Sequence, residues 1–128
     1  MEEMDYWRLN ELLTVVRAAL LVAEASPGKM GEYVENWDLE YRPEGYEAAK
    51  FAIRAALLAG KIEGQIVEEA EYDQNGNHIG YMSGTIDITE SLVVVESLRS
   101  WLLRRGFRSG FFFPESAGQP DYLDASHT

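Results

Sequence analysis

The chain has 128 residues and no cysteine, and its 22 acidic and 11 basic residues give a formal net charge of −11. A chain of this length favours a single domain (residues 1–128) around one hydrophobic core, and the absence of cysteine excludes disulfide bonds and thiolate metal sites. A surface this negative repels phosphate backbones. Direct nucleic-acid binding is therefore not expected, whereas a protein partner with a basic surface is.

Targeting signals are not evident. No stretch approaches the ~20 apolar residues of a membrane span, so no membrane contact is expected. The acidic beginning, MEEMDYWRLN, lacks the basic region of a signal peptide. We therefore expect a cytoplasmic protein with loose termini at residues 1–7 and 117–128.

The first predicted element is a helix over residues 8–25. Apolar residues recur in it at three- and four-residue spacing, which is typical of the buried face of a helix. They are Leu9, Leu12, Leu13, Val16, Leu20 and Ala23. Pro27 and Gly28 end this helix. In the connection that follows, YVENW is expected to form a short helical turn.

A second helix is predicted over residues 44–60. Pro43 suits its first turn, and Gly60 is a natural C-terminal end. Tyr46, Ile53 and Leu57 keep helical spacing between them. The segment is therefore expected to form a helix with one apolar face.

The pattern then changes to alternation, which predicts strands. One strand is expected within residues 65–73 and its return strand within residues 78–88. Asn75-Gly76 between them is typical of a tight hairpin turn with positive φ at both positions. The β-branched run at residues 92–95 predicts a third strand.

A final helix is predicted over residues 98–105, with Ser97 as its cap and Gly106 as its end. These elements predict an α+β fold in the order ααβββα: two helices, a three-stranded antiparallel hairpin region and a short C-terminal helix. Helices followed by a hairpin are also the order of a winged helix, so a winged-helix-like form belongs to this expectation.

No side-chain pattern indicates catalysis, so an enzyme is not expected, nor is a metal or cofactor. His78 stands alone beside the hairpin turn. GYMSG has its serine one position too late for a nucleophile elbow. DQNGNHIG lacks the glycine and the glutamate that a calcium loop requires.

Carboxylates are the candidate partner-binding residues, and they form two groups, one in the interhelical connection and one in the first hairpin strand. These residues are Glu32, Glu35, Asp38, Glu40, Glu68, Glu69, Glu71 and Asp73. Alternation places Glu69, Glu71 and Asp73 on one exposed strand face. That face is either a solvated edge that deters aggregation or a ladder of charges that imitates phosphates.

Residues 97–113 hold four arginines and no acid. One interpretation is a C-terminal clamp, in which Trp101 and one or two of the three phenylalanines are buried and the arginines pair with the protein's own carboxylates. The other is a contact surface, because three consecutive side chains of an extended segment cannot all face inward. Its secondary interface candidates are Arg104, Arg105, Arg108 and Phe111.

Three segments, YWRLNELLTVV, GYEAAKFAIRAALLAGKIEG and SLRSWLLRRGFRSGFFFP, resemble a group of small bacterial proteins encoded by prophages and integrative elements. The matching positions are Trp7, Leu9, Trp101, Leu102, Arg105, Gly106, Phe112, Phe113 and Pro114. The resemblance spans most of the chain and rests mainly on packing residues, so it carries no site residues. It implies an accessory protein of a mobile element in a bacterial host cell.

In size, charge and setting the chain is similar to anti-CRISPR proteins and other DNA mimics. The leading hypothesis is a non-catalytic acidic inhibitor that blocks a basic nucleic-acid-binding surface of a host defence complex. The alternative is a winged-helix-like DNA-binding transcriptional regulator or an excisionase-like factor. A further alternative is an oligomer assembled through FFFP, so both a monomer and a homodimer remain open.

Overall fold

The structure, a computed structural model, describes residues 3–31 and 33–116. Its helices and antiparallel strands confirm the α+β class. The elements are α1 (Glu3–Tyr6), η1 (Trp7–Leu9), β1 (Leu12–Thr14), α2 (Val15–Val22), α3 (Pro27–Met30), η2 (Val34–Asn36), η3 (Leu39–Tyr41), α4 (Tyr46–Leu58), β2 (Gly64–Gln65), β3 (Glu69–Tyr72), β4 (His78–Met82), β5 (Leu92–Val94), α5 (Val95–Arg104) and η4 (Pro114–Ser116). None of the helices within these described ranges is long and apolar enough to cross a membrane.

The N-terminal segment differs from both expectations made for it. Residues 3–7 are not loose, because Trp7 packs against the core and its indole Nε1 donates to Glu3 (3.0 Å), which also accepts from Ser26 (2.6 Å). The single helix over residues 8–25 is also wrong. The expected tail at residues 117–128 lies outside the described residues.

The long first helix is divided because residues 12–14 pair with β5 instead of coiling. Thr14 then caps α2, since its hydroxyl accepts from the backbone N–H of Arg17 (3.2 Å). Apolar side chains at three- and four-residue spacing thus belong to a strand followed by a helix. Leu13 of β1 and Val16 and Leu20 of α2 are buried in the same core, whereas Leu9 and Leu12 are exposed.

The three-stranded sheet has the order β1-β5-β2, and β3 and β4 form a separate two-stranded sheet. The predicted three-stranded hairpin region is therefore wrong in its pairing. β2 lies very close to β5: a Cβ on Gly64 would stand 2.1 Å from the carbonyl oxygen of Leu92. Glycine is thus required where the two strands meet.

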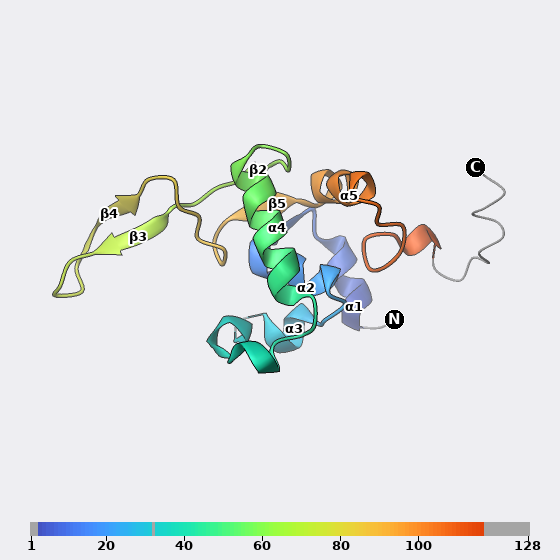
Figure 1. The fold of residues 1–128 in the computed structure, drawn as a ribbon, viewed down its shortest axis with the longest axis horizontal. Helices are drawn as coiled ribbons and strands as arrows, with labels where there is room; N and C mark the ends of the chain where they lie inside the picture. Colours follow the sequence, from blue (N-terminus) through green and yellow to red (C-terminus); the bar gives the residue numbers. More distant parts are fainter. Residues whose placement is uncertain (1–2, 32, 117–128) are drawn as a thin grey trace.

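The β3–β4 hairpin is an excursion from this sheet. The chain leaves as β2, runs out along β3, returns along β4 and re-enters as β5 (Figure 1). The hairpin extends away from the helices, as a wing does. Helices are thus followed by a hairpin, which is the order given for a winged-helix-like form, and α5 comes after the last strand.

The core lies between α2, α4, α5 and the three-stranded sheet. α4 ends at Leu58, close to its predicted end, but it begins at Tyr46, three residues after Pro43. Helix α5 begins at Val95, so Ser97 is not its cap; the Ser97 hydroxyl accepts instead from the backbone N–H of Glu63 (2.8 Å). The short turn expected in YVENW is confirmed as η2.

The C-terminal clamp packs more completely than predicted. Trp101 is 7% exposed, and Phe111, Phe112 and Phe113 are 6%, 6% and 3% exposed. The expectation of an exposed phenylalanine is wrong because the segment is not extended: the chain turns, and Phe113 N–H donates to the carbonyl of Gly110 (3.0 Å). Phe111 is therefore a core residue and not an accessible interface residue.

Candidate functional site

Glu35 of the interhelical connection is engaged inside the protein. Its carboxylate accepts from the Tyr46 hydroxyl (2.7 Å), and it forms ion pairs with Lys50 (3.0 Å) and Arg42 (3.5 Å). Glu47 pairs with the same two cations. This network ties the connection to α4 and neutralises Lys50, whose side chain is 8% exposed. Glu35 is thus a structural acid here.

The network changes the pKa values of Tyr46 and Glu47. Burial raises the pKa of Tyr46, and the hydrogen bond to Glu35 raises it further. For Glu47, burial acts to raise the pKa, but hydrogen bonds from Lys50 and Arg42 outweigh it and leave the pKa below its ordinary value. Glu47 is thus held as an anion within an internal cluster.

The other acids of the connection lie at the surface. Asp38 directly precedes η3, Glu40 lies within it, and both side chains are exposed. Neither side chain has a hydrogen-bond or ion-pair partner within residues 3–31 and 33–116. Glu32 lies outside the described residues.

The acids of the hairpin divide in the same way. Glu69 and Glu71 are exposed, stand opposite Met82 and Gly80 in the β3–β4 register, and have no cationic partner in the described part of the chain. Glu68 is engaged, since it accepts from the backbone N–H of Gly84 (3.1 Å). The expected acidic ladder is therefore two carboxylates long on β3.

Asp73 closes the hairpin turn. Its Oδ1 accepts from the backbone N–H groups of Asn75 and Asn77, both at 2.9 Å, and these bonds, that from Asn77 first, lower the pKa of Asp73. A bulge between Glu71 and Tyr72 also ends the alternation that was expected to align Asp73 with Glu71. Gly76 has φ of 83°, whereas Asn75 is not in the positive region, so the turn is not the two-residue type predicted.

The hairpin also exposes large apolar and aromatic side chains. Tyr72, Ile79 and Tyr81 are 60%, 60% and 58% exposed. His78 lies between the two tyrosines, with ring-centroid distances of 5.6 Å to Tyr72 and 5.0 Å to Tyr81. This cluster was not predicted, because alternation assigns one strand face to a core. The hairpin instead stands apart from the helices (Figure 1).

The arginines of α5 and the following loop pair differently from the expectation. Arg99 forms an ion pair with Glu115, as predicted. Arg108 instead donates to the carbonyls of Leu103 (2.9 Å) and Phe107 (3.0 Å). Within the described residues, no carboxylate pairs with Arg104, Arg105 or Arg108, so their predicted pairing with carboxylates is wrong.

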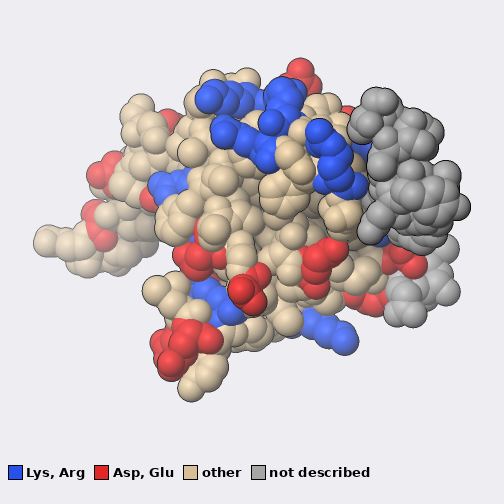
Figure 2. All heavy atoms as spheres, turned by 45° about the vertical axis from the view of Figure 1, so that its right-hand side comes forward, with Lys and Arg blue, Asp and Glu red and all other residues tan. Residues whose placement is uncertain are grey.

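Three cations instead surround an open hollow of about 560 Å³. Lys61, Arg104 and Arg105 line it together with Gly60 and Trp101. Arg104 donates to the carbonyl of Lys61 (3.5 Å), and the Arg105 guanidinium lies 5.4 Å from the centre of the Trp101 ring. Figure 2 shows Lys and Arg gathered along the upper part of the molecule, at the height of α5 in Figure 1.

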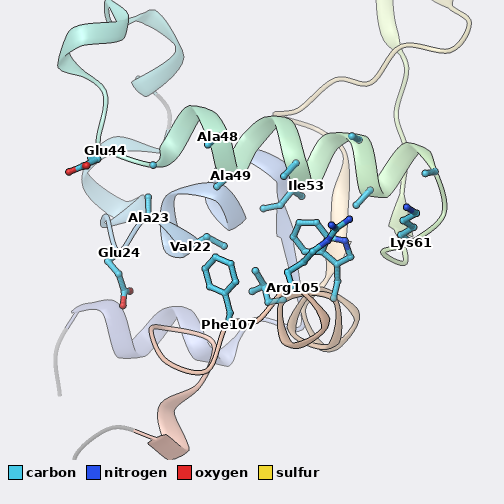
Figure 3. A pocket seen from close by; sticks show the side chains of 17 residues that line it. Val22, Ala23, Glu24, Glu44, Ala48, Ala49, Ile53, Lys61, Arg105 and Phe107 are labelled. Carbon is cyan, nitrogen blue, oxygen red and sulfur yellow. The ribbon is translucent and has the colours of Figure 1, made fainter.

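A larger groove of about 850 Å³ runs between α4, the end of α2 and the end of α5 (Figure 3). Its floor is apolar and rich in alanine. The alanines of α4 and its C-terminal end that line it are Ala48, Ala49, Ala52, Ala55, Ala56 and Ala59. Glu24 and Glu44 lie at one end, and Lys61 and Arg105 lie towards the other. A second apolar face on the predicted helix at residues 44–60 was the sequence signal for this groove.

His78 is exposed, and its ring contacts the rings of Tyr72 and Tyr81. Over residues 3–31 and 33–116, no group of histidine, aspartate and glutamate side chains has the arrangement to hold a metal ion. Two features of the described surface are candidates for contact with another molecule: the hairpin and the α4 groove.

Compared with protein-family models, with curated proteins and with solved structures, the chain has no significant match. The resemblance to mobile-element proteins stays a prediction. The candidate surfaces are therefore assessed on their geometry and charge.

Proposed function

We propose that this protein is a non-catalytic, acidic protein-binding protein whose β3–β4 hairpin docks on a basic protein surface. One observation carries the proposal. The hairpin extends away from the helices (Figure 1), and its Glu69 and Glu71 have no cationic partner among the described residues. Both carboxylates are therefore available to a partner, and they lie on the part of the chain that extends furthest from the helices.

The apolar side chains of the hairpin support the same surface. Tyr72, Ile79 and Tyr81 give it contact area beside the carboxylates. An isolated two-stranded hairpin is at best marginally stable in water, and exposed apolar clusters mark interaction sites. Docking would bury the aromatic cluster and hold the hairpin. The carboxylates would steer the approach of the partner, so association would be faster at low salt than at high salt.

The specific form of this proposal is an inhibitor from a mobile genetic element, of the anti-CRISPR or DNA-mimic type. It would block the basic nucleic-acid-binding surface of a host defence complex. The net charge of −11 and the sequence resemblance described above support this form. The hairpin would then enter the groove that nucleic acid otherwise occupies.

The test compares two charge reversals that raise the net charge equally. Glu69→Lys with Glu71→Lys alters the hairpin, and Asp38→Lys with Glu40→Lys alters the exposed acids of the connection. Retention of purified CRISPR effector complexes is measured at low and moderate salt. We expect salt-sensitive retention by the wild type and the connection variant, and loss in the hairpin variant.

Two results would overturn this. If no complex is retained at any ionic strength, the proposed class of target is wrong. If the hairpin variant is retained like the wild type, the hairpin is not the contact surface.

A winged-helix DNA-binding regulator is the second candidate, because the element order and the excursion of the hairpin favour it. In that arrangement α4, the helix before the wing, would enter the major groove. Its exposed residues lack cations and base-reading groups: they include Ala48, Phe51, Ala52, Ala55 and Leu58. Specific mobility shifts of promoter DNA from the mobile element that survive competitor DNA would favour this candidate over the first.

A further inference from the structure

We propose that two copies of this chain associate through the α4 groove, with the two α4 helices antiparallel across a two-fold axis. The inference is independent of the hairpin and of the partner it binds. It rests on the exposed face of α4 and on the charges at the two ends of the groove.

The face of α4 that lines the groove is apolar and uncovered. Ala48, Ala52 and Ala55 are exposed, and Phe51 and Leu58 on the same helix are 54% and 43% exposed. Small side chains allow another helix to approach to the lower end of the usual ~8–10 Å interaxial distance. Phe51 and Leu58 would then pack along the sides of the contact.

The charges of the groove select a second copy as its occupant. Glu24 and Glu44 lie at one end, whereas Lys61 and Arg105 lie towards the other (Figure 3). Within the described residues, none of these four side chains has an ion-pair partner. An antiparallel copy brings the acidic end of each groove to the basic end of the other, twice, as a two-fold interface requires.

The groove is also where the chain's negative charge is locally balanced. Its lining holds two acids and two cations, although the chain as a whole carries −11. Two copies can therefore meet there without the repulsion that other acidic surfaces would produce. Parallel helices would instead place like charges together at both ends.

Disulfide trapping tests the orientation, because the natural chain has no cysteine. Ala48 and Ala59 lie about 16 Å apart along the helix axis, from the rise of ~1.5 Å per residue. Antiparallel helices place Ala48→Cys of one copy near Ala59→Cys of the other. Mild oxidation of a mixture of these two variants should give the mixed disulfide dimer, with little dimer from either variant alone. Asn36→Cys, which is exposed on η2, is the control and should give no disulfide-linked dimer.

Charge exchange tests the ends of the groove. Glu44→Lys and Lys61→Glu should each weaken self-association by about tenfold, measured as the dimer dissociation constant by sedimentation equilibrium. The double variant has the net charge of the wild type and restores opposite charges across the axis, so it should recover the wild-type constant. Ala52→Glu should give a monomer with an unchanged far-UV circular dichroism spectrum, since this position is exposed in one copy.

Several results would overturn the proposal. Wild-type protein that stays monomeric at all concentrations would do so. Self-linking of Ala48→Cys as efficient as linking in the mixture would also contradict it, because that result indicates parallel helices. A dimer that tolerates Ala52→Glu, or a double charge variant no better than either single one, places the contact elsewhere.

Discussion

The helical body and the β3–β4 hairpin differ in how they use apolar side chains. In the body, Val15, Leu20, Tyr46 and Ile53 are at most 1% exposed. In the hairpin, no residue from 69 to 82 is buried. Burial of apolar area is the main favourable contribution to folding, so the stability of this protein resides in the body. The exposed side chains of the hairpin contribute little of this burial.

The two regions also treat their carboxylates differently. In the body, Glu35 and Glu47 are held by Lys50 and Arg42. In the hairpin, Glu69 and Glu71 face solvent without such cations. Substitutions in the body should therefore change the free energy of unfolding, and substitutions in the hairpin should change binding alone.

The largest effect is expected at Trp101. Replacement by alanine removes a side chain that closes α5 onto the core, and Trp→Ala in a core typically costs ~3–5 kcal/mol. Arg104→Ala with Arg105→Ala should cost far less, because exposed charged groups are worth roughly 0–1 kcal/mol each. Thermal unfolding followed by circular dichroism compares the two. An unchanged Tm for Trp101→Ala would show that the C-terminal segment is not a clamp.

A smaller loss is expected from Lys50→Met. This change keeps the aliphatic stem but leaves Glu35 and Glu47 with Arg42 as their remaining cation. Hydrogen bonds to charged groups are worth about 1.5–3 kcal/mol, so the free energy of unfolding should fall by that order. Urea unfolding measures it, and Lys29→Met, at an exposed position, is the control for the loss of one positive charge. Equal effects of both variants would mean that the network contributes nothing specific.

The same network predicts a pH dependence. Because the pKa of Glu47 is lowered in the folded protein from its ordinary value of 4.5, its contribution is fully present above that value and is lost as the pH falls through the lowered pKa. Stability should therefore decline below about pH 4.5, and Glu47→Gln should be less stable than the wild type at neutral pH but decline less on acidification. Parallel unfolding curves for the two proteins across this range would contradict the prediction.

The sequence predicted the elements of the body better than their pairing. The α4 helix, the β5 strand and the α5 helix all follow from local pattern. The β1 strand does not, because Leu12 to Thr14 have the spacing of a helix and become extended through their pairing with β5, far away in the chain. Non-local pairing of this kind leaves no trace in the local period.

The candidate site was predicted in part. The alternating pattern correctly predicted that Glu69 and Glu71 are exposed. It could not predict that Asp73 hydrogen-bonds within the turn or that Glu35 pairs with Lys50. The groove was also missed, since alanines at helical spacing serve a buried face and an uncovered one equally well. Which face is covered depends on where α5 lies, and that is again a tertiary fact.

The smallest effect on stability is expected from removal of the hairpin itself. Replacing residues 69–82 with a short glycine-serine linker removes no buried side chain. It shortens the loop between β2 and β5, and because a halving of loop length changes closure entropy by only about 0.6 kcal/mol, the free energy of unfolding should change by less than ~1 kcal/mol. The replacement also removes or weakens two hydrogen bonds at the base of the hairpin, that from Glu69 N–H to Thr85 and that from Gly84 N–H to Glu68. Their loss lowers the free energy of unfolding, whereas the shorter loop raises it. Urea unfolding of this variant and of the wild type measures the net change in the free energy of unfolding. Hydrogen exchange of the intact protein measures local stability, and the amides of β3 and β4 should exchange far faster than those of α4. A loss of several kcal/mol, or equal protection of both regions, would place the hairpin inside the cooperative unit and remove the distinction between the body that folds and the hairpin that binds.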